Sequence, residues 1–213
     1  MSRSSVLEWP DGSGWLVLAG GPDTAIRGQA IQRMAAGGVV VYVNTGQGSD
    51  TIQEDMEDLG APTGYILDIL SEDDETIQQQ MADANLIVLG GDDPPSAIRS
   101  ALIGPVASAI RQGFERGSVL LCEGPAAAVW GTWMVDEVGT LLPGLDWLPR
   151  SIVLPGVTSA AGNPLATRLL AEHPNALLIG PGTSSALSLG PEGAVEAWGA
   201  RQVMVALGRE YST

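Results

Sequence analysis

Short apolar runs alternate with amphipathic stretches along most of the chain. Trp15–Ala19 (WLVLA) is a continuous apolar run of the kind found in buried strands. In the stretch that follows, Ala25–Ala36, the apolar residues Ile26, Ala30 and Met34 recur at helical spacing. This alternation is typical of a parallel sheet covered by helices on both faces. The pattern predicts an α/β fold, a three-layer, doubly wound and mostly parallel sheet.

The same alternation continues through the first two thirds of the chain. Further strands are predicted at Val39–Val43, Tyr65–Ile69, Leu86–Leu89 and Ser118–Leu121. Helices are predicted from Ser49 or Asp50 to Gly60, after Ser71, from Pro95, at Val106–Arg116 and at Ala126–Val135. A stretch rich in proline and glycine, 139–156, then separates these elements from the last third.

The last third changes character. After a short helix at Leu165–Glu172, strands are predicted at Ala176–Ile179, Ala186–Leu189, Ala194–Trp198 and Val203–Leu207. Turn residues separate them, which favours short antiparallel strands at one edge of the sheet. No internal repeat and no long linker divides the chain, so we expect a single domain over residues 1–213, with 1–13 as a loose end.

Charge excludes one class of partner. The formal net charge is −15, and all ten basic residues are arginines. Such a chain repels phosphate backbones, so we expect no nucleic-acid binding. An acidic surface favours cationic partners, or simply keeps the protein soluble. The apolar runs are far shorter than the ~20 residues of a membrane span, and Met1–Trp9 has no apolar signal core, so we expect a cytoplasmic protein with no membrane contact.

Two single residues limit the chemistry. Cys122 is the only cysteine, which excludes an internal disulfide, and His173 is the only histidine. Any Ser–His or Cys–His pair would therefore have to use His173. We expect Cys122 to be a buried, inert thiol and His173 to be a residue at the end of a helix. Ser184 and Ser185 are candidate nucleophiles, or turn-forming hydroxyls.

Several segments, in this order and spacing, together resemble the peptidase S51 family, which includes cyanophycinase and dipeptidase E and is related to class I glutamine amidotransferases. They are Trp15–Asp23 (WLVLAGGPD), Ala84–Asp93 (ANLIVLGGDD), Cys122–Trp130 (CEGPAAAVW), Val138–Gly144 (VGTLLPG), Arg168–Pro174 (RLLAEHP) and Gly180–Leu189 (GPGTSSALSL). The resemblance implies a serine on a strained strand-to-helix turn, a histidine base, a carboxylate that orients it, and an oxyanion hole. It places this elbow at the carboxyl ends of the strands.

The elbow of this chain lacks a nucleophile in either of two alignments, which put Gly124 or Pro125 at the serine position. The nucleophile position usually has a positive φ, which the ring of proline forbids and glycine adopts freely. We therefore favour Gly124 at the tip and Pro125 at the first helical position. Pro125 then also removes the backbone N–H that the residue after the nucleophile normally gives to the oxyanion.

The other positions implied by the resemblance also lack the expected residues. The histidine position falls on Ser159, or on Gly156 in a looser alignment, and the acidic positions fall on residues 182–184. The glutamine of the family's G-G-[DN]-Q segment is Asp93. The resemblance thus gives vestigial positions and no catalytic residue: Gly90, Gly91, Asp92, Asp93, Glu123, Gly124, Pro125, Ser159, Thr183 and Ser184.

Three carboxylates follow neighbouring strands of the predicted sheet and should lie near the vestigial site. Asp92, Asp93 and Glu123 are candidates to bind a divalent cation, an arginine or a polyamine, or they cap helices and face water. We expect no cofactor. Trp130 and Trp133, three residues apart on the predicted helix, form with Trp147 either an interface patch or part of the core.

Three functional hypotheses remain open from the sequence. The first is a non-catalytic protein of this fold, kept for binding or assembly. The second is a hydrolase of Asp-containing dipeptides or β-aspartyl peptides that uses Ser184, Ser185 or a water on a metal held by the three carboxylates. The third is a structural subunit, as a homodimer or in a complex with an active relative.

Overall fold

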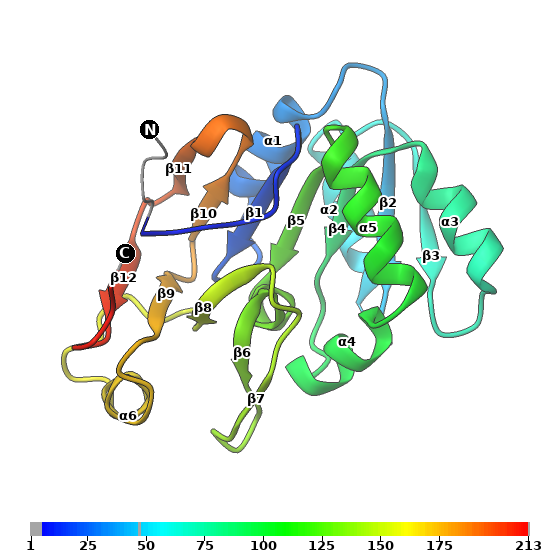
Figure 1. Cartoon of the computed structure of the whole chain (residues 1–213). Helices are drawn as coiled ribbons and strands as arrows, with labels where there is room; N and C mark the ends of the chain where they lie inside the picture. The colour runs from blue at the N-terminus through cyan, green and yellow to red at the C-terminus, as the bar shows by residue number, and fades with distance from the viewer. Residues whose placement is uncertain (1–5, 47, 213) are drawn as a thin grey trace.

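The larger of two sheets organises the fold of the computed structural model, which describes residues 6–46 and 48–212 (Figure 1). It has seven strands in the order β11-β10-β1-β5-β4-β2-β3. Their bounds are β1 Trp15–Ala19, β2 Val39–Asn44, β3 Gly64–Asp68, β4 Ala84–Leu89, β5 Val119–Glu123, β10 Ser185–Leu189 and β11 Val195–Gly199. The strands from β1 to β3 in this order run parallel, and β10 and β11 are antiparallel. The predicted α/β class with an antiparallel edge is confirmed, but only two of the four predicted edge strands lie there. The strands predicted at Ala176–Ile179 and Val203–Leu207 belong to a second sheet.

Helices cover both faces of this sheet, as the alternating pattern predicts. They are α1 Thr24–Arg33, α2 Ser49–Asp58, α3 Asp74–Ala82, α4 Pro95–Leu102 and α5 Pro105–Arg116, with α6 Pro164–Glu172 beside the second sheet. Side chains of a strand alternate between faces, so Val17 packs with α1 and α2 whereas Leu16 packs with α3, α4 and α5. The longest helix, α5, has 12 residues, and no helix in the described part of the chain is both long and apolar enough to cross a membrane.

A second sheet, which the sequence does not predict as a separate sheet, lies below the larger sheet in Figure 1. Its order is β12-β9-β8-β6-β7, with bounds β6 Gly131–Val135, β7 Leu141–Pro143, β8 Leu148–Val153, β9 Leu177–Pro181 and β12 Val203–Leu207. Strands β6, β8 and β9 run parallel, and β7 and β12 pair antiparallel at the two edges. The stretch 139–156, read as a connection, therefore holds two strands.

The predicted helix at Ala126–Val135 is wrong. A 3₁₀ helix, η1, spans Gly124–Trp130, and the chain then becomes β6. The alanines favour a helix locally, but the residues after Trp130 gain backbone partners in β7 and β8. At Gly131 a side chain would begin 2.5 Å from the carbonyl oxygen of Ser151, so this close pairing of β6 with β8 needs a glycine.

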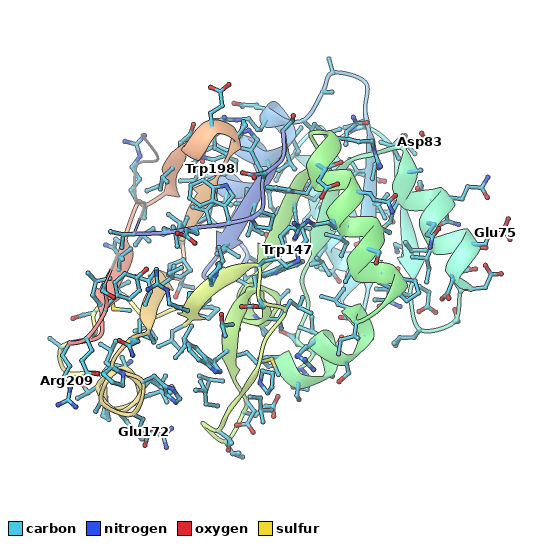
Figure 2. All side chains as sticks on the ribbon, viewed as in Figure 1. Glu75, Asp83, Trp147, Glu172, Trp198 and Arg209 are labelled. Atoms are coloured by element: carbon cyan, nitrogen blue, oxygen red, sulfur yellow. The ribbon has the colours of Figure 1, made fainter. Side chains whose placement is uncertain are left out.

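The tryptophans serve the core instead of a helix face. Trp130 and Trp147 are buried, with ring centroids 4.7 Å apart in an edge-to-face arrangement, and Phe114 packs on Trp147 at 5.5 Å. Figure 2 shows Trp147 in the interior of the molecule. Trp133 lies on β6 and packs against His173. The core alternative therefore holds for Trp130 and Trp147, and the shared helical patch with Trp133 is wrong.

The described part of the N-terminal segment, from Val6, contacts the sheet. The indole N–H of Trp9 donates to the carbonyl oxygen of Gly190 at 3.0 Å, and the N–H of Ser13 donates to that of Glu115 at 3.3 Å. Residues 1–5, part of the segment expected to be loose, lie outside the described residues.

Candidate functional site

The carboxyl ends of four adjacent parallel strands, β1, β5, β4 and β2, lie side by side at one end of the larger sheet. The strand registers place Ala19 beside Glu123, Cys122 beside Leu89 and Leu89 beside Val43. The chain leaves β2 toward α2 on one face and leaves β4 toward α4 on the other. Open α/β sheets bind ligands in the crevice that such a divergence creates. We call this end of the sheet, with the carboxyl ends of the strands, the crest.

The turn after β5 lies where the resemblance to S51 peptidases places the elbow, and its first residue is a glycine with a positive φ. Gly124 has a φ of +53°, and Pro125 follows at the start of η1. The expected tip of the elbow needs a positive φ, and Gly124 has one. An ideal Cβ built on Gly124 has no atom within 4 Å, apart from its chain neighbours. The space that a nucleophile would occupy is thus open, and the next residue has no N–H to offer an oxyanion.

A buried ion pair lies directly beneath this turn. Arg27 of α1 donates from Nε to Oε1 of Glu123 at 2.9 Å and from Nη2 to Oε2 at 2.7 Å. Its third nitrogen, Nη1, donates to Oδ2 of Asp55 in α2 at 2.7 Å. The side chains of Arg27 and Glu123 are 4% and 2% exposed, and that of Asp55 is 54% exposed. One guanidinium therefore ties α1, α2 and β5 together under the crest.

The electrostatics of this pair follow from burial. Burial raises the pKa of Glu123, and the hydrogen bonds and charge of Arg27 offset part of that rise. Burial lowers the pKa of Arg27, but Glu123 and Asp55 outweigh it and raise that pKa above its ordinary value. Because both oxygens of Glu123 accept from Arg27, the geometry is that of an ionised carboxylate.

Cys122 lies one residue before this pair and is fully buried. Burial raises the pKa of its thiol well above the ordinary value, a contact with the Trp130 indole lowers it in part, and the charge of Glu123 raises it further. A thiol in that state is protonated and a poor nucleophile. The placement fits the expectation of an inert cysteine.

The three candidate metal ligands do not converge. Glu123 is engaged by Arg27, while Asp93 accepts from the hydroxyl of Thr45 at 3.1 Å. Asp92 is exposed, and its carboxylate has no bonding partner among residues 6–46 and 48–212. No group of three His, Cys, Asp or Glu side chains in the described part of the chain has the geometry to hold a metal ion.

The positions that the resemblance to S51 peptidases gives for the histidine and the acid carry glycine or hydroxyl side chains. Ser159 is exposed and donates to the carbonyl oxygen of Ala161. An ideal Cβ on Gly156 would lie 3.9 Å from Oγ1 of Thr183, so the looser alignment pairs two vestigial positions in space. Ser184 is exposed, whereas Ser185 is buried and accepts from the N–H of Gln202 at 3.0 Å.

His173, the single histidine, ends α6 and packs on Trp133 with ring centroids 5.3 Å apart. It does not line either hollow at the crest. The expectation of a residue at a helix end therefore agrees with its position.

Two hollows flank the elbow and share Gly124 and Pro125. The first, of about 260 Å³, is lined by four charged side chains, and for these we call it the polar hollow. Its other lining residues are Pro22, Arg27, Gly48, Thr51, Ile52, Asp55, Gly91, Asp92 and Glu123. The second, of about 310 Å³, is the apolar hollow, lined also by Gly20, Pro95, Ala128, Val135, Val153, Leu154, Pro155, Val157 and Leu165.

Arg27 and Asp55 are the site residues that sequence reasoning missed. Arg27 lies 96 positions from Glu123 in the chain, and nothing local links the two. One signal was available: Asp23 caps α1 just after β1, so Arg27 stands one turn into a helix that begins at the crest. A cation at that position, on the face that carries Ile26 and Ala30, is unusual for a core-facing helix.

Comparison with solved structures identifies the fold. A peptidase from an acI-B1 Actinobacterium matches with a TM-score of 0.73 and 19% identity, over 93% of this chain and 93% of its own. A candidate peptidase E protein from Listeria monocytogenes EGD-e matches with a TM-score of 0.60 and 13% identity, over 86% of this chain and 97% of its own. No family model matches the sequence, and neither does any curated protein. The chain has the α/β fold of these peptidase structures.

Proposed function

We propose that this protein is a non-catalytic relative of S51-type serine peptidases, which retains the crest as a binding site. The observation that carries the proposal is the turn Gly124-Pro125, where a bare glycine at positive φ precedes a residue with no N–H. Acyl transfer on this fold needs a hydroxyl and an amide hydrogen at these two places. The fold that the chain shares with peptidase structures supports the origin of the site, and the turn supports its loss of catalysis.

The losses at the crest are cumulative. Removing one oxyanion donor alone costs on the order of 2.7–4 kcal/mol of transition-state stabilisation. The nucleophile is absent as well, and the single histidine packs on Trp133. A serine placed at Gly124 would therefore still have no base to accept its proton.

Binding is the function that such a site still supports. The crest keeps two hollows at the position where this type of sheet binds ligands, above a fixed ion pair. Acidic side chains in the polar hollow favour a small cationic or peptide ligand. We further propose that the protein is cytoplasmic, that it forms a homodimer or a complex with an active relative, and that it needs no cofactor. The hydrolase alternative needs Ser184, Ser185 or a metal site, and no contact described above favours it.

The test is a hydrolysis assay of the full chain with β-aspartyl-arginine and dipeptides with N-terminal Asp, combined with fluorophosphonate labelling. We expect no turnover above the buffer rate and no labelled serine, in the native chain and in the Gly124→Ser variant.

Turnover by the native chain that disappears in Ser184→Ala, Ser185→Ala or Asp92→Asn, but persists in the control Ser108→Ala on the exposed face of α5, would overturn the proposal. So would labelling of either candidate serine.

A further inference from the structure

The two hollows at the crest meet at Gly124, which has no side chain. Both are lined by Gly124 and Pro125, so they adjoin at the tip of the elbow. A Cβ at this position would project into space with no atom within 4 Å. In an enzyme of this fold, a nucleophile would stand in that space. In its absence the space above Gly124, between the polar hollow and the apolar hollow, is open, and we call the two hollows together the groove.

The volumes favour use of the joined groove over either part. Small-molecule sites commonly measure about 300–1,000 Å³. The polar hollow, at about 260 Å³, falls below that range, and the apolar hollow, at about 310 Å³, lies at its lower end. A ligand that crosses Gly124 has the space of both.

The polar end of the groove prefers a positive charge. Its lining carries three carboxylates, on Asp55, Asp92 and Glu123, against the single guanidinium of Arg27. All three nitrogens of that guanidinium donate to Glu123 or Asp55, so its positive charge is already paired with these two carboxylates. The carboxylate of Asp92, by contrast, has no bonding partner in the described part of the chain, and it is exposed. The formal charge of −15 adds a field of the same sign.

The other end of the groove prefers an apolar chain. The end of β8 and the segment after it contribute Val153, Leu154 and Val157, while Leu165 comes from α6 and Val135 from β6. No charged side chain lines this hollow. Covering such a surface with an aliphatic group removes apolar area from water on both partners.

We propose that the crest binds an organic cation with an aliphatic chain, of the alkylamine class. The ammonium group lies in the polar hollow beside Asp92 and Asp55, and the chain passes over Gly124 into the apolar hollow. This inference rests on the proposed function, since a groove across the elbow exists only where no nucleophile stands. It adds the chemical class of the ligand, which differs from the Asp-containing dipeptides and β-aspartyl peptides that the resemblance to S51 peptidases implies as substrates.

The experiment is calorimetric titration of the full chain with four probes: hexylamine, ethylamine, hexanol and hexanoate. Hexylamine carries both the ammonium group and the aliphatic chain. Ethylamine has the ammonium group with a short chain, hexanol has the chain without a charge, and hexanoate has a chain with a negative charge. We expect hexylamine to bind at least about tenfold more tightly than each of the others, because four added methylenes and one charge each contribute.

Two variants and a control locate the probe. Asp92→Asn should reduce hexylamine affinity about fivefold or more and leave hexanol unchanged, because it removes the free carboxylate. Gly124→Ala should lower the affinity for hexylamine to nearly that for ethylamine and leave the affinity for ethylamine unchanged. The added methyl group then blocks the passage of the aliphatic chain over residue 124. The control is Asp83→Asn, which removes another exposed carboxylate, at the end of α3 away from the crest, and should change neither affinity.

Equal binding of hexylamine and ethylamine, or hexanoate binding as tightly as hexylamine, would sink the inference, as would an unchanged hexylamine affinity in both crest variants. Circular dichroism of each variant separates these results from loss of fold. The hydrolysis assay is read independently. If the amines do not bind and no turnover is seen, only the proposed ligand class is wrong. If turnover is seen, the proposed function is wrong.

Discussion

At the scale of single residues, the pair of Arg27 and Glu123 is the interaction on which the crest most depends. The Glu123→Ala variant leaves the guanidinium of Arg27 buried, with Asp55 as its remaining partner. Breaking a buried pair by removing one partner typically costs about 3–5 kcal/mol, and we expect the lower part of that range because Asp55 stays. Urea unfolding of the variant and the native chain measures the difference.

The matched control for that variant is Glu210→Ala. Glu210 pairs with Arg209 at 3.4 Å, but both side chains are mostly exposed. Exposed pairs contribute about 0–1 kcal/mol, so its midpoint should hardly move. Equal losses in the two variants would mean that burial adds nothing to the Arg27 pair.

The site could be predicted from sequence only where backbone chemistry is local. The fixed φ of proline argues against Pro125 at the tip of the turn, and the structure places Gly124 there with φ +53°. The pairing of Glu123 with Arg27 depends on a helix and a strand that meet only in the folded chain, so spacing carries no trace of it. The same holds for Asp92 and Asp93, which are adjacent in sequence but meet different surroundings.

At the scale of elements, the larger sheet was predictable and the second sheet was not. Strands β2, β4 and β5 are continuous apolar runs that end at turn residues, which is a strong local signal. The segment that forms η1 and β6 contains three consecutive alanines, which favour a helix, and its strand forms because β7 and β8 supply partners. Tertiary pairing overrides local propensity there.

The close contact of β6 with β8 gives a prediction for this element. In Gly131→Ala the new methyl would lie 2.5 Å from the carbonyl oxygen of Ser151, which is backbone and cannot turn aside. We expect a loss of about 1–3 kcal/mol in unfolding free energy, as for overpacked cores. Denaturant unfolding, followed by the fluorescence of the six tryptophans, which include the nearby buried Trp130, measures it.

Gly28→Ala is the control for the same substitution in open space. Gly28 lies inside α1, and an ideal Cβ there has no atom within 4 Å. Alanine is the better helix former, so this variant should be as stable as the native chain or up to about 1 kcal/mol more stable. A Gly131→Ala variant that behaves like Gly28→Ala would show that β6 and β8 are not held at this spacing.

At the scale of the whole molecule, charge opposes the compact state. The chain carries 25 acidic and ten basic residues. Figure 2 shows charged side chains such as Glu75, Asp83 and Glu172 at the periphery, where they repel one another through water. Of the ion pairs in the described part of the chain, only that of Arg27 with Glu123 is buried on both sides. Surface attraction is therefore too sparse to balance the repulsion.

Salt should for this reason stabilise the protein. Raising sodium chloride from 0.01 M to 1 M shortens the Debye length from about 30 Å to about 3 Å, which screens exposed charges and leaves the buried pair almost untouched. We expect the melting temperature to rise by a few degrees, where about 1 kcal/mol corresponds to roughly 2–4 °C in a chain of this size. Calorimetry at both salt concentrations measures it.

Asp83→Asn, which removes a negative charge from the end of α3 where the helix dipole disfavours one, should raise the melting temperature at low salt and narrow the salt response. A melting temperature that falls with salt would instead mean that attractive surface pairs outweigh the net charge.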